Sequence, residues 1–154
     1  MRVDPRFAEL YEAEFQTIFR TVFLLCGDRA AAEDATQEAF ARALERWRRL
    51  RDQPWVAGWI TTTAMNAARR GFRRRPDPPA PLPREADMEA SWDLWRAVRA
   101  LPARQQEAVV LHYAIGLPVA EVAQAMGCGE GTVKAHLSRA RDALRGRLQE
   151  ARDE

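Results

Sequence analysis

The chain has 154 residues, of which 47% are hydrophobic and 30% charged, a balance typical of a folded protein with one or two small domains. It has neither an apolar run long enough to span a membrane nor a charged and then apolar leader, so we expect a cytoplasmic protein. Cys26 and Cys128 lie far apart, without further metal ligands at suitable spacing. We therefore expect both thiols to be reduced and buried, with no zinc site, other metal or cofactor.

Positive charge is concentrated in two clusters, although the net charge of the chain is only +2. Such clusters are typical of surfaces that bind phosphate, whereas either one alone is equally compatible with a solvated helix face. The first cluster contains Arg69, Arg70, Arg73, Arg74 and Arg75, and the second contains Lys134, Arg139, Arg141, Arg145 and Arg147.

The first half of the chain is predicted to form three helices. Apolar residues at three- and four-residue spacing predict a helix over Pro5–Cys26 that ends at the following glycine. Asp28 is expected to cap a second helix, whose apolar stripe runs from Ala32 to Trp47. Asp52 and Pro54 mark the start of a third helix. The inward face of this third helix is expected to contain Val56, Trp59, Ile60, Thr63 and Ala67.

A proline-rich linker is predicted over residues 76–90. Five of the nine residues from Arg75 to Pro83 are proline, and an acidic stretch follows them. Proline fixes φ and removes a backbone donor, so neither a helix nor a central strand is expected to continue through this segment. The linker divides the chain into one domain over residues 1–75 and another over residues 91–154.

The second half is also predicted to be helical. Ser91 is expected to cap a helix over Trp92–Leu101, and Pro102 and Pro118 are expected to start helices that end at Ile115 and Met126. The last predicted helix runs from about Gly131 to Leu148. Because no strand-like alternation occurs, we predict an all-α fold of two small helical domains.

Residues Leu117–Leu144 have the pattern of a helix-turn-helix. Ala123 and Gly127 are four residues apart, as the crossing of the two helices and the tight turn require. The predicted core of this motif contains Val122, Met126, Val133 and Leu137. The outward face of the second helix is predicted to contain Lys134, Ala135, Ser138 and Arg139, with Arg141, Arg145 and Arg147 following for the DNA backbone. The alternative is a plain helical hairpin.

The segment Pro54–Arg75 begins aromatic and ends basic, a combination that suits unstacked bases. We interpret Trp59 as core, because aromatic residues at helical spacing are usually buried. The glycine at position 58 costs about 1 kcal/mol relative to alanine inside a helix, and it is either needed for close backbone approach or simply tolerated. The predicted surface for bases and phosphates contains Trp55, Asn66, Arg69, Arg70 and Phe72.

Together these segments resemble the extracytoplasmic-function (ECF, group 4) sigma factors of bacterial RNA polymerase. Asp34–Phe40 resembles region 2.2 of this family, Pro54–Asn66 resembles regions 2.3 and 2.4, and Leu101–Leu144 is similar to region 4. The resemblance implies an alternative sigma factor that docks on the core polymerase, reads the –35 element as duplex, and melts and captures the –10 element. The chain departs from the family pattern at Thr62 and Thr63, where an arginine and an aliphatic residue are common.

The resemblance also implies roles for individual residues. Contacts to the core polymerase would come from Asp34, Gln37 and Glu38. Contacts to the –10 strand would come from Asn66, Arg69 and Arg70, and the loop around Arg51–Pro54 would hold a flipped base. Contacts to the –35 duplex would come from Lys134, Ala135, Ser138 and Arg139.

The expected partners are the β′ and β subunits of the polymerase and promoter DNA, with an anti-sigma factor as a further candidate. An enzyme is not expected, since His112 and His136 have no catalytic constellation around them and His112 is interpreted as structural. The alternative is a stand-alone transcription regulator, because Thr132–Leu137 also resembles the recognition helix of LuxR-type regulators. A receiver domain in such a regulator would need an α/β pattern, which residues 1–90 lack.

Overall fold

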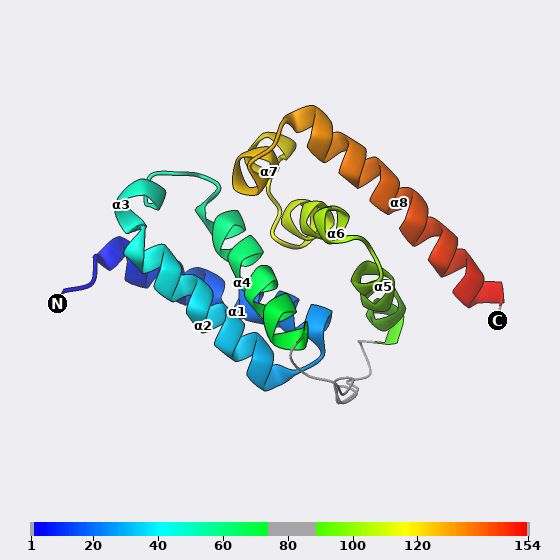
Figure 1. Cartoon of the computed structure of the whole chain (residues 1–154), viewed down its shortest axis with the longest axis horizontal. Coiled ribbons are helices and arrows are strands. Elements are labelled where there is room, and N and C mark those ends of the chain that lie inside the picture. Colours follow the sequence, from blue (N-terminus) through cyan, green and yellow to red (C-terminus); the bar gives the residue numbers. More distant parts are fainter. Residues whose placement is uncertain (1, 74–88, 154) are drawn as a thin grey trace.

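The computed structural model describes residues 2–73 and 89–153, and both ranges consist of helices joined by short turns. No strand occurs in either range, which confirms the predicted all-α fold class. The first range contains α1 (Pro5–Cys26), α2 (Arg29–Glu45), the single-turn α3 (Trp47–Leu50) and α4 (Val56–Arg73). The second contains α5 (Glu89–Arg99), α6 (Ala103–Val109), the π-helix η2 (Val110–Ala114), α7 (Val119–Met126) and α8 (Glu130–Asp153) (Figure 1).

The predicted linker over residues 76–90 lies outside the described residues up to position 88. Its last two positions, Glu89 and Ala90, belong to α5. Ser91 is therefore inside this helix, and the prediction that it caps the helix was wrong.

Local signals set both ends of α1 and the start of α2 as predicted. The carboxylate of Asp4 accepts a hydrogen bond from the backbone N–H of Arg6 at 2.9 Å, and Pro5 occupies the first turn of α1. Gly27 ends α1 in the left-handed conformation (φ 72°), which a residue with a side chain adopts at a cost. The carboxylate of Asp28 then accepts a hydrogen bond from the backbone N–H of Ala31 at 3.0 Å and caps α2.

The connection between α2 and α4 differs from the prediction. α2 ends at Glu45, and Trp47 lies in the separate turn α3, where its indole N–H donates to Asp4 at 2.9 Å. This contact with the start of α1 redirects the chain, which the helical periodicity alone did not indicate. Asp52 does not start the next helix. Its carboxylate pairs with Arg6 at 2.9 Å, and α4 begins at Val56.

Aromatic rings hold the first half together. Phe40 of α2 is 2% exposed and meets Phe7, Tyr11 and Phe15 of α1 at centroid distances of 6.3, 4.9 and 5.7 Å. Phe7 also meets Trp47 edge-on at 5.2 Å. These edge-to-face and tilted contacts favour one specific packing of α1 against α2 and α3.

The second half also departs from the predicted helices in detail. The predicted helix over Pro102–Ile115 is present, but its last turn widens into η2, where the N–H of Ile115 donates to the carbonyl of Val110 at 3.0 Å. α7 ends at Met126 as predicted. α8 extends beyond the predicted Leu148 to Asp153, because most of the added residues (Gln149, Glu150, Ala151 and Arg152) are good helix formers.

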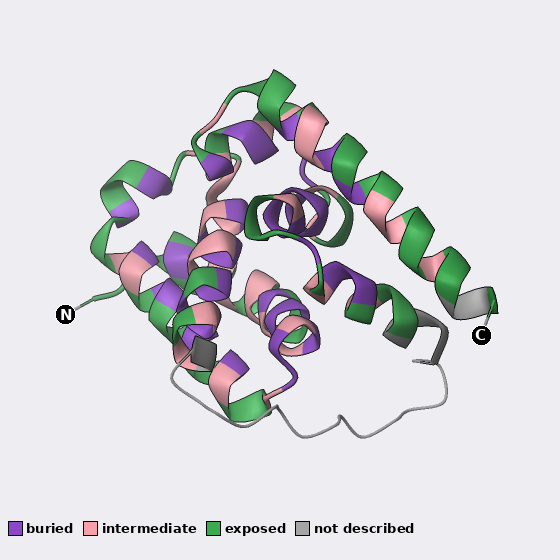
Figure 2. Cartoon of the chain, turned by 45° about the vertical axis from the view of Figure 1, so that its right-hand side comes forward, coloured by how far each residue is buried: buried purple, intermediate pink, exposed green. Residues whose placement is uncertain are grey.

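The helices before and after the linker pack against each other. α4 lies against α7, and α1 lies against α5 (Figures 1 and 2). Because α4 contacts α1 and α2 as well as α7, its buried face is wider than the predicted stripe. Ile60 and Ala67 are buried, and Val56, Trp59 and Thr63 are half-buried. The buried face also contains Thr61, Ala64, Met65 and Ala68, which were not predicted.

Candidate nucleic-acid interface

The turn between α7 and α8 has the geometry of a helix-turn-helix. Gly127 adopts the left-handed conformation (φ 68°), and the N–H of Cys128 donates back to the carbonyl of Ala123 at 3.0 Å. The guanidinium of Arg104 donates to the carbonyl of Met126 at 2.8 Å and so satisfies the end of α7. All of the predicted core residues of the motif are buried, namely Val122, Met126, Val133 and Leu137. Their burial fixes which face of α8 points outward.

The outward face of α8 carries most of the side chains predicted for duplex DNA. Lys134, Ser138 and Arg139 are exposed, whereas Ala135 is half-buried and offers only a methyl group. Arg141 is exposed and donates to the hydroxyl of Tyr113 at 3.0 Å. The face therefore combines point charges, a short hydroxyl and a guanidinium at helical spacing, which suits the major groove.

The predicted base-reading surface on α4 is partly covered. Asn66 is exposed, Arg70 is exposed and Trp55 is half-buried against the core. Arg69 is not free, because its guanidinium donates to Gln106 at 2.7 Å and to the carboxylate of Glu107 at 3.0 Å. It also donates to the side-chain oxygen of Asn66 at 3.0 Å. Arg69 was predicted to contact a phosphate, but in this structure its guanidinium contacts α6 instead.

Other predicted features of α4 can also be located. The hydroxyl of Thr62 is buried, and the hydroxyl of Thr63 donates to the backbone of Trp59 at 2.8 Å, so neither faces the solvent as a phosphate ligand. The side chain of Phe72 lies outside the described part of the chain. Arg51 is exposed beside Asp52, in the loop predicted to hold a flipped base.

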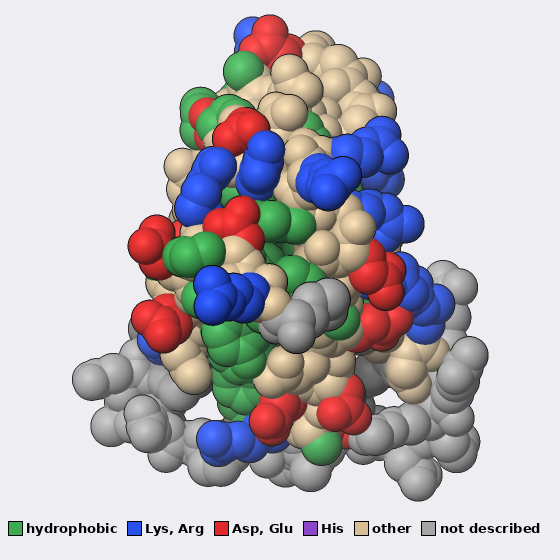
Figure 3. Space-filling view, turned by 90° about the vertical axis from the view of Figure 1, so that its left-hand side faces the viewer, with side chains coloured by type: hydrophobic (Ala, Val, Ile, Leu, Met, Phe, Trp, Pro, Cys, Tyr) green, Lys and Arg blue, Asp and Glu red, His purple; other side chains and the backbone are tan. Residues whose placement is uncertain are grey.

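The three residues predicted to contact the polymerase lie on the exposed face of α2. Asp34, Gln37 and Glu38 are all exposed, and the amide of Gln37 donates to the hydroxyl of Tyr11 at 3.0 Å. Glu38 pairs with Arg42 at 2.7 Å and with Arg70 of α4 at 3.2 Å. Asp34 and Glu38 border a hollow of about 330 Å³ between α2 and α4. Figure 3 shows one face of the molecule, with basic side chains in a band across it and acidic side chains close by.

Glu107 is the site residue that sequence reasoning missed. It is 3% exposed and pairs with both Arg69 and Arg104, at 3.0 and 2.8 Å. A glutamate in a helix is ordinarily solvated, so its burial signals a specific partner. The signal available in the sequence was the placement of Glu107 directly before an apolar run, with Arg104 three residues earlier.

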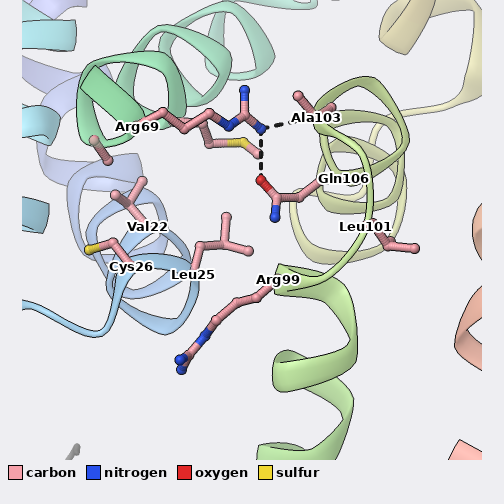
Figure 4. Close-up of a pocket in the computed structure, with 10 residues that line it drawn as sticks. Val22, Leu25, Cys26, Arg69, Arg99, Leu101, Ala103 and Gln106 are labelled. Atoms are coloured by element: carbon pink, nitrogen blue, oxygen red, sulfur yellow. Dashed lines mark hydrogen bonds between the residues drawn. The ribbon is translucent and has the colours of Figure 1, made fainter. Parts of the chain in front are cut away.

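A cavity of about 370 Å³ lies where the two halves meet. It is bordered by Cys26 of α1, Met65 and Arg69 of α4, and Arg99 and Gln106 of the second half (Figure 4). The Arg99 guanidinium donates to the carbonyl of Leu24 at 2.9 Å. Burial lowers the pKa of Arg99 below the usual value for arginine, and the nearby charge of Arg96 acts in the same direction.

The structure also shows the surroundings of His112 and of the two cysteines. His112 Nδ1 lies 2.8 Å from the carbonyl of Leu117, which fits the predicted structural role. Cys26 is buried, but Cys128 is half-buried, so the prediction that both thiols are buried was wrong for Cys128. Within residues 2–73 and 89–153, no cluster of three or more histidine, cysteine or acidic side chains has the geometry to hold a metal ion. None of the helices in these ranges is long and apolar enough to cross a bilayer.

Both halves of the chain match known protein families. Residues 10–76 match the family model for sigma-70 region 2, and residues 91–144 match the model for sigma-70 region 4. The chain is 33% identical to the ECF RNA polymerase sigma factor BldN of Streptomyces coelicolor, over 83% of this chain and 54% of that protein. It is 31% identical to the ECF RNA polymerase sigma factor SigM of Mycobacterium tuberculosis, over 90% of this chain and 74% of that protein.

The chain therefore belongs to the sigma-70 family, within the ECF group of RNA polymerase sigma factors. It spans about half of BldN and 38% of the probable RNA polymerase sigma factor RfaY of Xanthomonas campestris, to which it is 30% identical.

Two solved structures share the fold. One is the sigma factor RpoE of Bartonella quintana in complex with the anti-sigma factor NepR, with a TM-score of 0.75 and 23% identity over 93% of this chain and 96% of that chain. The other is CnrH in complex with the cytosolic domain of CnrY, with a TM-score of 0.73 and 21% identity over 94% of this chain and 88% of that chain.

Proposed function

We propose that the chain is an alternative sigma factor, which binds core RNA polymerase and directs promoter-specific initiation of transcription. The observation that carries this proposal is the match to region 2 and then region 4 in a single chain. In this proposal the protein acts in the cytoplasm by binding and performs no covalent chemistry. Sequence specificity and strand opening then depend on two surfaces, one on α8 and one on α4.

The proposed role of α8 is to read the –35 element as duplex. Arg139 can donate two parallel hydrogen bonds to O6 and N7 of a guanine, the commonest specific contact in the major groove. Ser138 and Ala135 are short enough to allow close approach of the helix. Lys134 and Arg141 supply positive charge to the DNA backbone, which sets the position of the helix without selecting sequence. The exposure of Lys134, Ser138 and Arg139 supports this assignment.

The proposed role of α4 and the turn before it is to capture the –10 element as single strand. The Asn66 amide can read base edges, Trp55 can provide a stacking surface, and Arg69 and Arg70 can neutralise phosphates. Such contacts offset the cost of unpairing and unstacking a base, which is a few kcal/mol. Arg70 and Asn66 are exposed, which supports their part of the proposal.

The proposed contact with the polymerase uses Asp34, Gln37 and Glu38 of α2, whose exposed and partly acidic face suits a basic partner surface on the β′ subunit. The β subunit is the expected second contact in the core enzyme. An anti-sigma factor is a further proposed partner, since one structural relative was solved with an anti-sigma factor and the other with the cytosolic domain of a second protein. The alternative of a stand-alone LuxR-type regulator does not account for the region 2 match.

Run-off transcription by purified core RNA polymerase tests the proposal directly. A library of randomised promoters is transcribed with and without the protein, and the transcripts that depend on it are sequenced. We expect such transcripts to share two elements at a fixed spacing, one for each reading surface. Tight duplex binding by the protein alone, with no protein-dependent transcripts, would contradict the proposal and favour the stand-alone regulator.

A further inference from the structure

Four arginines gather in and beside the single turn α3, at the outer end of the first half (Figure 1). Residues 46–51 read RWRRLR and contain no acidic residue. Figure 3 faces this end of the molecule and shows a band of basic side chains across it. The proposed roles in –10 and –35 recognition leave two of these arginines, Arg48 and Arg49, without a ligand.

The inner side of α3 is fixed by buried contacts. Trp47 and Leu50 are three residues apart, so they lie on one face of the turn, and they are 7% and 4% exposed. The indole N–H of Trp47 donates to Asp4 at the start of α1. The guanidinium of Arg46 lies over the ring of Trp59 in α4, at 5.8 Å from its centroid. These contacts hold the turn in one orientation against α1 and α4.

The two residues between Trp47 and Leu50 face the solvent. Arg48 and Arg49 are exposed, and within residues 2–73 and 89–153 neither side chain has a hydrogen bond or a carboxylate partner. Two neighbouring guanidiniums repel each other unless a counter-charge is present, so a bound anion would relieve this repulsion. The backbone beneath them is fixed by the buried face of the turn. The pair is therefore a preorganised site for negative charge.

The acidic residues on either side of the cluster do not neutralise this pair. Glu45 precedes Arg49 by four residues, the spacing that forms ion pairs in a continuous helix. The helix breaks at Arg46, however, and Glu45 has no ion pair in the described part of the chain. The carboxylate of Asp52 is engaged by Arg6 at 2.9 Å. The positive charge of the turn is thus left for an external partner.

The position of α3 indicates which anion it would meet. The turn is followed directly by the loop around Arg51–Pro54, proposed to hold a flipped base, and then by Trp55, proposed to provide a stacking surface. A captured base brings its backbone phosphates with it. A guanidinium can pair with phosphate oxygens through two parallel hydrogen bonds, and the cluster contains arginine without lysine.

We propose that Arg48 and Arg49 form a phosphate clamp, which binds the backbone of the –10 strand next to the captured base. The clamp reads no base. It raises affinity by releasing counterions from the DNA and fixes the path of the strand beside the reading surface. This inference rests on the proposed function, since it takes the loop around Arg51–Pro54 and Trp55 as contacts to the –10 element.

The first test uses the full chain without polymerase, because Arg48 and Arg49 are exposed in the free chain. Fluorescence anisotropy measures its affinity for a fluorescein-labelled, randomised single-stranded DNA over a range of salt concentrations. The test variant carries Arg48→Gln and Arg49→Gln, which removes both charges and nearly preserves helix propensity. Circular dichroism and urea unfolding check that it is folded.

The matched control carries Arg20→Gln and Arg29→Gln, which change the net charge by the same amount. Both residues are exposed. Arg20 lies in the last two turns of α1 and Arg29 is the first residue of α2, whereas α3 meets the start of α1 and follows the end of α2. At 1.5 Å per residue, the lengths of these helices place both control positions roughly 20 Å from the clamp.

We expect the test variant to lower the slope of log affinity against log salt concentration by about 1.4, because each phosphate contact to a single strand contributes roughly 0.7. Between roughly 50 and 200 mM salt, the wild-type chain should then lose about sevenfold more affinity than the test variant. The control should keep the wild-type slope, and Arg48→Lys with Arg49→Lys should restore it. The clamp is wrong if the test variant and the control have equal slopes.

A second test locates the contact on a promoter obtained by run-off transcription. Single phosphates around the –10 element are replaced with neutral methylphosphonates, and binding of the holoenzyme is measured. The wild-type holoenzyme should lose affinity at phosphates that flank the captured base, and the Arg48→Gln, Arg49→Gln holoenzyme should not respond there. Equal losses at every position would overturn the placement beside the –10 strand. Weaker binding to core polymerase with an unchanged DNA salt slope would also overturn it, and would assign the pair to an acidic polymerase surface.

The outcome is separable from that of the proposed function. Protein-dependent transcripts, together with equal salt slopes for the test variant and the control, would overturn the clamp and leave the sigma-factor function intact. Absence of transcripts would overturn the function and the placement on the –10 strand, whereas the salt slope of the free chain would still decide whether α3 binds phosphate.

Discussion

Arg70 of α4 and Glu38 of α2 form an ion pair at 3.2 Å, and Arg42 shares the same carboxylate oxygen at 2.7 Å. The pair joins a residue proposed to contact promoter DNA with a residue proposed to contact the polymerase. A basic polymerase side chain that binds Glu38 would compete with Arg70 for the carboxylate. The two proposed binding surfaces of the first half are therefore in direct electrostatic contact.

Glu38→Gln should weaken binding to core RNA polymerase while leaving the fold nearly unchanged. Its pairs with Arg42 and Arg70 are solvent-exposed, and such pairs contribute at most about 1 kcal/mol to the free energy of unfolding. Binding is measured by titration of labelled core enzyme, and stability by urea unfolding. The exposed Glu33 of the same helix supplies the control variant Glu33→Gln. Equal affinities for the two variants would remove Glu38 from the polymerase contact.

Arg139→Ala should weaken promoter use by about 1–3 kcal/mol and relax the preference at one position of the –35 element. The reason is the loss of two hydrogen bonds to one guanine. Run-off transcription from promoters with each base at each –35 position measures both effects. Arg145→Ala, further along α8, should instead reduce transcription evenly across sequences and lower the salt dependence. An unchanged base preference in the Arg139 variant would show that this residue reads no base.

Asn66→Ala should spare the closed promoter complex and impair strand opening, because its amide is proposed to read a base only after that base leaves the stack. The closed complex is measured by gel shift at low temperature, and opening by permanganate reactivity of thymines in the –10 element. Gln16→Ala, which removes an exposed amide from α1, is the control. Normal permanganate reactivity in the Asn66 variant would refute its role.

Asp4→Asn should lower the stability of the fold at neutral pH and have little effect in strong acid. Hydrogen bonds from the backbone N–H of Arg6 and from the indole of Trp47 hold the pKa of Asp4 below its usual value of 3.8. A depressed carboxyl pKa contributes stability above that value, and this stability is lost as the pH falls through the lower pKa of the folded state. Urea unfolding at pH 7 and in acid below the lowered pKa of the folded state, with Asp93→Asn as the control, measures the difference. A deficit that persists unchanged in acid would contradict the assignment.

Much of the fold follows from local signals in the sequence. Asp4, Gly27 and Asp28 set the ends of α1 and the start of α2, because capping and left-handed glycine are properties of a few adjacent residues. The motif formed by α7 and α8 was predictable for the same reason, since its buried residues and its turn lie within one short segment. The exposure of Lys134, Ser138 and Arg139 follows from their spacing on α8.

What escaped prediction depends on contacts between distant segments. The break at Arg46 is followed by Trp47, whose indole N–H donates to Asp4, 43 positions away. Buried Glu107 pairs with Arg69, which is 38 positions away across the linker, as well as with the nearby Arg104. Gly58 could be read either as tolerated or as needed for close approach, and only the position of Leu117 decides between the two. The spacing of apolar residues within one helix does not indicate which distant segment packs against it.

The exposed face of α2 has a further consequence. Asp34, Gln37 and Glu38 are exposed in this structure, whereas Arg69 is held against α6. On the proposed roles, the surface for the polymerase is available before the surface for the melted strand. The geometry then prescribes an order of assembly, with polymerase first and promoter second. Before it meets the polymerase, such a chain would bind exposed single-stranded DNA weakly, because Arg69 is engaged with Glu107.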